Sequence, residues 1–297
     1  MTIRKAVLPV AGFGTRVLPA TKAVPKEMLP VVDRPALQYV VDEALEAGIE
    51  HIVFVTGRNK GAIEDYFDRA YELEVTLDQK RKESAAAKLK ATILPPGSAS
   101  FVRQQSPLGL GHAIWCARDI IANEPFAVLL PDVIIQSNPG CLAQMVGAYE
   151  KLGGNILAVD AVPDSEVSKY GVISPVERDG RTIRIDGMVE KPAKEDAPSN
   201  LKITGRYILQ PDIFDLLANQ GAGAGGEIQL TDAMERLMAQ QVFHAYEYEG
   251  KDYDCGSILG YFEAVLGHAI QHEEISDDAR ALIAKLAKEG ELSLIHI

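Results

Sequence analysis

Five short apolar runs alternate with longer helical stretches in the first half of the chain, and this alternation limits the fold more than any other feature. A strand, a helix and a second strand in succession form the unit of a parallel sheet covered by helices. Strands are expected over residues 4–10, 51–56, 99–104, 126–130 and 155–162. Helices are expected over residues 37–47, 60–71, 111–121 and 141–152, with a charged, solvent-exposed helix over residues 78–90.

The second half of the chain begins with strands that follow one another without a helix between them. Strands are expected over residues 172–177, 182–190 and 201–209, with a later strand-like run over 243–253. Successive strands of this kind pair in antiparallel or mixed fashion. Further helices are expected over residues 211–217, 229–239, 257–271 and 276–288. The predicted fold is α/β: a Rossmann-like mixed, mainly parallel central sheet flanked by helices, with an added β region and C-terminal helices.

Composition narrows the class of protein. With 297 residues and 47% hydrophobic content, the chain can bury one substantial core, which suits a single large domain. A formal net charge of −12 argues against a nucleic-acid partner, whose phosphates need a basic face. No apolar stretch approaches the roughly 20 residues of a membrane span. The three cysteines form no close pair and suit a reducing compartment, so we expect a cytoplasmic protein without a membrane partner.

The segment 9–30, PVAGFGTRVLPATKAVPKEMLP, follows the first expected strand and combines glycines, prolines and cations. Gly12 and Gly14 allow backbone N–H groups to approach an anion closely, although a glycine turn without a ligand is an equally good interpretation. The spacing matches neither the P-loop nor the dinucleotide-binding fingerprint. Arg16 and Lys26 add fixed cations of the kind that an acidic protein needs to hold a nucleoside triphosphate. The segment is therefore a candidate phosphate site of another type.

Two aspartates are candidate metal ligands. Asp132 follows the strand expected at 126–130, at the end where open α/β sheets bind ligands, although such a residue is also a common turn former. Asp254 follows the strand-like run that ends at 253. Two carboxylates from distant segments, completed by phosphate oxygens, make a ligand set for Mg²⁺. Glu190 and Lys191 end another expected strand, where an exposed ion pair is the alternative interpretation.

Ordered motifs along the chain resemble the bacterial UTP–glucose-1-phosphate uridylyltransferases, a branch of the sugar nucleotidyltransferases. The matching motifs are AGFGTR (11–16), PATKAVPKEMLP (19–30), VRQQSPLGLGHA (102–113), LPDV (130–133), KYGVI (169–173), VEKP (189–192), TGRY (204–207), GEIQLTD (226–232) and DCGSILGY (254–261). The resemblance extends over roughly residues 1 to 275, and chance agreement of so many ordered motifs is remote.

The resemblance implies an Mg²⁺-assisted transfer of a uridylyl group from UTP to glucose 1-phosphate, giving UDP-glucose and pyrophosphate. It implies one nucleotidyltransferase domain over residues 1–291, with a nucleotide-binding half (1–135), a sugar-binding half (136–256) and C-terminal helices (257–291) as an oligomer contact. Members of the family form homodimers or homotetramers. Residues 292–297 (LSLIHI) are expected to be a tail added by cloning.

Site residues are carried over from the matching motifs. The resemblance implies catalytic roles for Arg16, Lys26 and Lys191. It implies nucleotide contacts from Ala11, Gly12, Gly14, Thr15, Gln104, Gly109 and Asp132. It implies sugar contacts from Gly171, Glu190, Lys191, Thr204 and Gly205, and Mg²⁺ ligation by Asp132 and Asp254.

Two alternative functions remain at this stage. One is the same reaction with another nucleotide or sugar, as in a thymidylyltransferase; the other is a non-catalytic protein that binds nucleotide sugars, because a fold alone does not establish activity. Retention of Arg16 and of both aspartates favours the enzyme. His268 and His272 have a metal-ligand spacing but no HExxH motif, and we expect both to face solvent.

Overall fold

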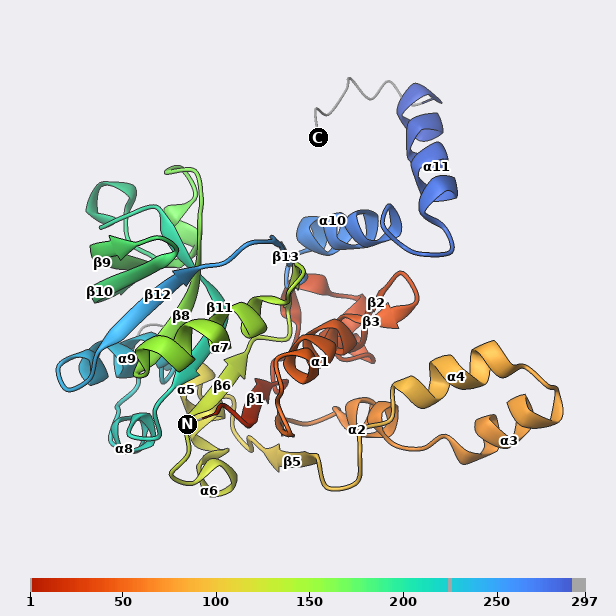
Figure 1. Cartoon of the computed structure of the whole chain (residues 1–297), viewed down its shortest axis with the longest axis horizontal. Helices are drawn as coiled ribbons and strands as arrows, with labels where there is room; N and C mark the ends of the chain where they lie inside the picture. The colour runs from red at the N-terminus through yellow and green to blue at the C-terminus, as the bar shows by residue number, and fades with distance from the viewer. Residues whose placement is uncertain (1, 224–225, 290–297) are drawn as a thin grey trace.

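A nine-stranded sheet forms the centre of the molecule (Figure 1). The computed structural model describes residues 2–223 and 226–289, so the expected tail at 292–297 lies outside it. The strand order is β5-β4-β1-β6-β11-β8-β12-β10-β9. The bounds are β1 (Lys5–Pro9), β4 (His51–Thr56), β5 (Ala99–Arg103), β6 (Phe126–Leu129), β8 (Asn155–Ala161), β9 (Gly171–Asp179), β10 (Thr182–Glu190), β11 (Leu201–Leu209) and β12 (Phe243–Glu247). The five strands expected in the first half all form, each within one residue of its expected ends.

The sheet is mixed, and the expectation of a mainly parallel sheet is wrong. Strands β5, β4, β1 and β6 are parallel neighbours, and β12 runs parallel to β8. The other neighbouring pairs in the order are antiparallel, because β11 returns beside β6 and β8 in the opposite direction, and β10 does so beside β12. A further pairing of β9 with β11 closes β11, β8, β12, β10 and β9 into a ring.

Helices cover both faces of the sheet, and each face has its own apolar core. The first core lies under α5 (Leu110–Trp115), α6 (Arg118–Ile121), α8 (Ile213–Ala218) and α9 (Leu230–Met238). The second lies under α1 (Ala36–Glu46), α2 (Gly61–Phe67) and α7 (Cys141–Leu152). Alternate residues of β1 divide between the cores: Val7 belongs to the first, Ala6 and Leu8 to the second. A strand covered on both faces therefore reads as one continuous apolar run.

Three expected elements are divided, and the first is the helix expected at 111–121, which forms as α5 and α6. The helix expected at 78–90 is a pair of helices, α3 (Tyr71–Gln79) and α4 (Glu83–Ala91), with Arg81 at φ 53° between them. This left-handed backbone ends α3, and the pair projects from one side of the molecule (Figure 1). The run expected at 243–253 divides at a turn into β12 and β13 (Lys251–Asp254), which leaves the main sheet to pair with β7 (Val133–Gln136). A separate short hairpin joins β2 (Pro30–Val31) to β3 (Arg34–Pro35).

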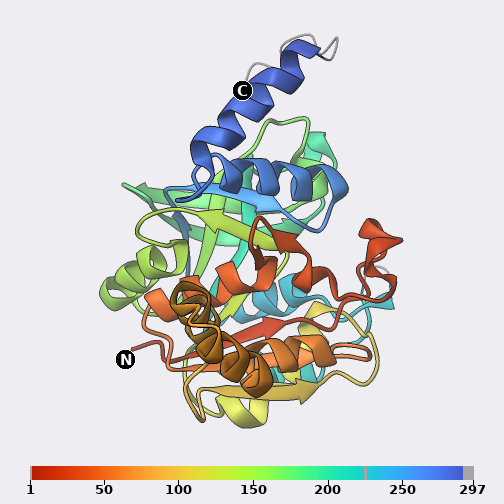
Figure 2. The same cartoon turned by 90° about the vertical axis from the view of Figure 1, so that its right-hand side faces the viewer.

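The C-terminal helices lie at one end of the molecule. Helix α10 (Ile258–Ala269) packs on β13, and α11 (Ser276–Glu289) stands away from the sheet (Figures 1 and 2). His268 was expected to face solvent, but it is buried between the rings of Tyr39 and Tyr253, because its turn of α10 faces the body of the protein. Among residues 2–223 and 226–289, no helix has the length and apolar character that crossing a bilayer requires.

Candidate active site

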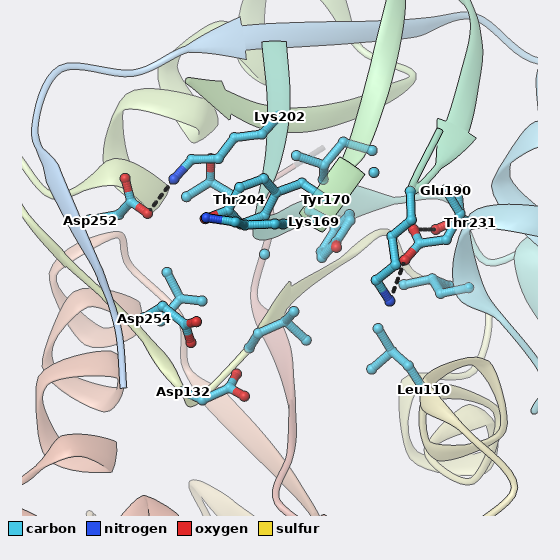
Figure 3. A pocket seen from close by; sticks show the side chains of 18 of the residues that line it. Leu110, Asp132, Lys169, Tyr170, Glu190, Lys202, Thr204, Thr231, Asp252 and Asp254 are labelled. Atoms are coloured by element: carbon cyan, nitrogen blue, oxygen red, sulfur yellow. Dashed lines mark hydrogen bonds and ion pairs between the residues drawn. The ribbon is translucent and has the colours of Figure 1, made fainter. Parts of the chain in front are cut away.

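A polar cavity of about 480 Å³ opens between the carboxyl end of the parallel strands and the β9–β11 region (Figure 3). Eight of the residues predicted for the site line it: Arg16, Asp132, Gly171, Glu190, Lys191, Thr204, Gly205 and Asp254. Lys26 is not part of the lining but forms an ion pair with Asp132, which is. The other predicted residues lie outside the lining: Ala11, Gly12, Gly14, Thr15, Gln104 and Gly109. The cavity therefore joins the predicted sugar and metal residues, whereas the predicted base contacts are not part of its lining.

The glycine-rich loop after β1 is folded back on itself by three short 3₁₀ turns at Thr15–Val17, Ala20–Lys22 and Lys26–Met28. Thr21 Oγ1 donates to the carbonyl of Gly14, whose φ is 65°. A β-carbon on Gly14 would lie 3.1 Å from Cβ of Lys26, and one on Gly12 would lie 3.7 Å from its Cε. Gly14 thus leaves room for the stem of Lys26, which runs toward the cavity, whereas a β-carbon on Gly12 would make only an ordinary contact with it.

Lys26 ends in an ion pair with Asp132, at 2.6 Å between Nζ and Oδ2. Burial opposes the charge of both groups, but their mutual attraction outweighs it: the pKa of Lys26 is raised and the pKa of Asp132 is lowered. Both groups therefore carry their charge across the neutral range. Next to them Glu27 is fully buried and accepts a 2.7 Å bond from Lys60, which anchors the loop to the segment after β4.

The two predicted metal ligands meet at Gly256. A β-carbon built on this residue would lie 2.9 Å from Oδ1 of Asp254 and 3.1 Å from Oδ2 of Asp132. The backbone N–H of Cys255 also donates to the carbonyl of Asp132, at 2.7 Å, and so fixes β13 against the end of β6. In the described part of the chain no three His, Cys, Asp or Glu side chains form a metal group of their own. Two carboxylates completed by substrate phosphates is nevertheless the usual donor set for Mg²⁺, so these residues fit that ion.

The opposite wall carries the predicted sugar residues. Glu190 Oε2 accepts from Thr231 at 3.2 Å, and Oε1 pairs with Lys191 Nζ at 3.2 Å. Lys191 has φ 47°, a left-handed conformation that is held by its backbone N–H bond to the carbonyl of Tyr170. A β-carbon on Gly171 would lie 3.0 Å from Glu190 Oε2, so the missing side chain keeps that oxygen accessible.

Two of the predicted base contacts, Gln104 and Gly109, are hydrogen-bonded to each other outside the cavity lining. Gln104 is buried, and its Nε2 donates to the carbonyl of Gly109 at 3.0 Å and lies 3.0 Å from Nδ1 of His112. Burial lowers the pKa of His112, which favours the neutral ring. Gly109 has φ 101° and sits against Ile228, so the segment that follows β5 is fixed there. The amide of Gln104 is therefore held in one orientation.

Comparison with known proteins identifies the family. The nucleotidyl transferase family model matches residues 5–269. The chain is 49% identical over 291 residues to the UTP–glucose-1-phosphate uridylyltransferase of Bacillus subtilis, covering 98% of this chain and 99% of the relative. It is 53% identical over 255 residues to the enzyme of that name from Komagataeibacter xylinus, covering 86% and 90%. The chain belongs to the nucleotidyl transferase family, among the bacterial UTP–glucose-1-phosphate uridylyltransferases.

Solved uridylyltransferase structures share the fold. A UTP-bound enzyme from Acinetobacter baumannii superposes with a TM-score of 0.89 at 46% identity, covering 96% of this chain and 99% of that one. A UDP-glucose pyrophosphorylase in complex with UDP-glucose gives a TM-score of 0.84 at 46% identity, covering 91% of this chain and 100% of that one. The mixed α/β architecture is therefore that of this family.

Sequence reasoning missed several residues that line the cavity. They include Lys169, Tyr170, Lys202, Tyr207, Thr231 and Asp252. Lys169, Tyr170, Tyr207 and Thr231 fall inside motifs that carried the resemblance, so the motifs pointed to them. Lys202 and Asp252 lie outside those motifs, and no local pattern marks either one.

Proposed function

We propose that this chain transfers the uridylyl group of UTP to glucose 1-phosphate, with release of pyrophosphate and formation of UDP-glucose. One observation carries the proposal: the cavity joins a carboxylate pair and the Lys26 cation at one end to Glu190 and Lys191 at the other. A nucleoside triphosphate and a sugar phosphate can therefore bind next to each other in this cavity. The nearly full-length identity to uridylyltransferases supports the choice of both substrates.

The chemistry needs alignment and charge rather than a base. An oxygen of glucose 1-phosphate, ionised at neutral pH, attacks the α-phosphorus of UTP. The bond from that phosphorus to the oxygen bridging the α- and β-phosphates breaks, and pyrophosphate leaves with the electron pair. Arg16 and Lys26 stabilise the charge that develops on the leaving group, and Lys191 holds the sugar phosphate in line. Glu190 accepts hydrogen bonds from the sugar hydroxyls beside Gly171.

Asp132 and Asp254 would hold Mg²⁺, which supplies positive charge to the nucleotide phosphates when it is bound. Because Lys26 already neutralises one oxygen of Asp132, the residue presents its remaining acceptor capacity to the ion. The proximity of both carboxylates to Gly256 supports this assignment, since any side chain at residue 256 would crowd them.

We assign recognition of the nucleotide base to Gln104. Its Nε2 is engaged by Gly109, which fixes the amide and directs Oε1 to serve as an acceptor. Uracil presents a ring N–H donor at N3, whereas cytosine presents an acceptor there, so this acceptor favours UTP over CTP. The backbone around Ala11, Gly12 and Thr15, which follows β1, would also contact the nucleotide.

A pyrophosphate-release assay tests the reaction with UTP, dTTP and ATP, each supplied with glucose 1-phosphate. We expect turnover chiefly with UTP; faster release with dTTP would favour a thymidylyltransferase, and no release with any pair would favour a binding protein. Lys26→Ala is expected to lower kcat by about 10² to 10³. Lys22→Ala is the matched control, because Lys22 is an exposed lysine of the same loop. Equal turnover in the two variants would remove the assigned role of Lys26.

The organisation of the chain belongs to the same proposal. Residues 1–135 form the nucleotide-binding half, 136–256 the sugar-binding half, and 257–291 a contact between copies in a homodimer or homotetramer. Support for the contact comes from Ile258, Leu259 and Phe262 of α10, which are exposed apolar side chains. The free thiols of Cys116, Cys141 and Cys255 suit the cytoplasm. Light scattering tests the assembly, and a monomer at micromolar concentration would contradict it.

A further inference from the structure

An ion pair that no step above uses lies in the wall of the cavity. Lys202 Nζ and Asp252 Oδ2 are 2.6 Å apart, and their side chains are only 9% and 15% exposed. Lys202 comes from β11 and Asp252 from β13, so the pair joins the sugar-binding region to the strand that carries Asp254. Asp252 Oδ1 also accepts from the hydroxyl of Tyr248 at 3.2 Å. Both oxygens of this carboxylate are thus engaged, and its position is fixed.

The pair sits at the phosphate end of the cavity. In Figure 3 Lys202 reaches toward Asp252 on the side of Asp254, while Glu190 lies across the cavity. Asp252 precedes Asp254 by two residues on the same strand, so both side chains point to one face of β13. Lys202 therefore adds a second cation, besides Lys26, on the side of the cavity where the carboxylates that would hold Mg²⁺ lie.

The cavity needs such a cation. Its lining contains four cationic side chains and four carboxylates; the cations are Arg16, Lys169, Lys191 and Lys202, and the carboxylates are Asp132, Glu190, Asp252 and Asp254. The protein charges therefore balance, whereas the proposed substrates bring several negative charges. An ion pair in a low-dielectric wall adds little to stability compared with apolar residues, so a charge retained there is better explained by a charged ligand.

The ammonium of Lys202 has hydrogen-bonding capacity left. It carries three N–H donors, of which one meets Asp252, and the face of the Tyr170 ring lies 5.1 Å from Nζ. Within the described residues, no second hydrogen-bond acceptor contacts Nζ. Because Lys202 lines the cavity, a ligand bound there can accept from these remaining donors.

We propose that Lys202 is a further phosphate-binding residue of the uridylyl-transfer site and that Asp252 is its positioning partner. Lys202 donates to a non-bridging oxygen of the diphosphate of UDP-glucose while it stays bonded to Asp252. This inference rests on the proposed function, which supplies the diphosphate. Asp252 holds the ammonium in place and at the same time weakens its attraction for the phosphate, because it adds a negative charge nearby.

The test measures UDP-glucose binding by titration calorimetry in the presence of a chelator, so that no metal contributes. Lys202→Met removes the cation and is expected to weaken binding about tenfold or more. Asp252→Asn keeps an acceptor for Lys202 but removes a negative charge, so it is expected to tighten binding about threefold. Uridine, which has no phosphate, is expected to bind both variants as it binds the unmodified chain.

Glu263→Gln is the matched control, since it breaks the exposed 2.8 Å ion pair of Lys251 with Glu263 outside the cavity. It is expected to leave UDP-glucose affinity unchanged. If the Lys202–Asp252 pair has only a structural role, Lys202→Met and Asp252→Asn should both weaken UDP-glucose binding, or neither should change it. Either result overturns the inference. Absence of pyrophosphate release by the unmodified chain would instead refute the proposed function, so the two failures are distinguishable.

Discussion

Glu43→Gln tests how the end of β6 is held in place. Arg206 is fully buried and pairs with Glu43, with 3.0 Å between Nε and Oε1 and 2.8 Å between Nη2 and Oε2. The same guanidinium donates to the carbonyls of Leu130 and Val133, at 3.1 and 2.8 Å. Those carbonyls flank Asp132, so the buried pair from α1 and β11 fixes the backbone that carries a proposed metal ligand.

The expected loss of stability follows from the interactions that a glutamine at position 43 cannot make with Arg206. Its amide oxygen can still accept from Nε, but its NH₂ group faces the Nη2 donor, and the buried guanidinium loses its counter-charge. Removing one partner of a buried ion pair costs about 3–5 kcal/mol of unfolding free energy. An unfolding entropy of about 2.1 cal/mol/K per residue amounts to about 0.6 kcal/mol/K for 297 residues. The melting temperature is therefore expected to fall by about 5–8 °C.

Differential scanning calorimetry on the metal-free protein measures this shift. Glu263→Gln serves as the control, because the side chains of Lys251 and Glu263 are both 55% exposed and an exposed pair adds little stability. The control is expected to melt within about 1 °C of the unmodified protein. A fall of less than about 2 °C for Glu43→Gln, or equal falls in both variants, would refute the reasoning that the pair is desolvated and essential.

Two further predictions concern the loops around the site. Gly109→Ala should lower the free energy of unfolding by about 1–3 kcal/mol more than Gly97→Ala. Both residues have positive φ, but only at Gly109 would a β-carbon clash, 2.9 Å from the Ile228 carbonyl, so equal losses in urea unfolding would argue against the clash. Asp132→Asn should reduce the amount by which the free energy of unfolding falls in acid. Burial alone would raise the pKa of Asp132, but Lys26 holds it below its ordinary value, so the stabilisation is present above about pH 3.9 and is lost as the pH falls through the lower folded pKa. Urea midpoints from about pH 5 to about pH 2 measure this, and a variant as acid-sensitive as the unmodified protein would contradict it.

Much of the fold could be predicted because its signals are local. The strands β1, β4 and β6 are covered on both faces, so their central residues form continuous apolar runs in the sequence. The two sides of the cavity were marked by motifs, so Asp132 and Glu190 could be named in advance. The parallel character of the sheet was overestimated, since the direction in which β11 returns depends on partners far along the chain.

The interpretation of the glycine-rich loop also changed with the structure. Sequence spacing suggested that Gly12 and Gly14 open the backbone to a phosphate. The structure places the stem of Lys26 beside Gly14, where a β-carbon would lie 3.1 Å from Cβ of Lys26, so the missing side chain of Gly14 serves the lysine. Spacing along a loop cannot distinguish these cases, because the path of a side chain is decided by the ion pair at its end.

The amino-acid sequence by itself indicated the family, most of the strands and helices in their order, and the residues proposed for the transfer of a uridylyl group. Periodicity, turn residues and motifs act over a few neighbours, so they can be recognised in the chain alone. Only the tertiary structure decided which of these residues meet: Asp132 with Asp254 over Gly256, and Lys202 with Asp252. Those meetings depend on the register of strands distant in sequence, which is set by the packing of the whole core.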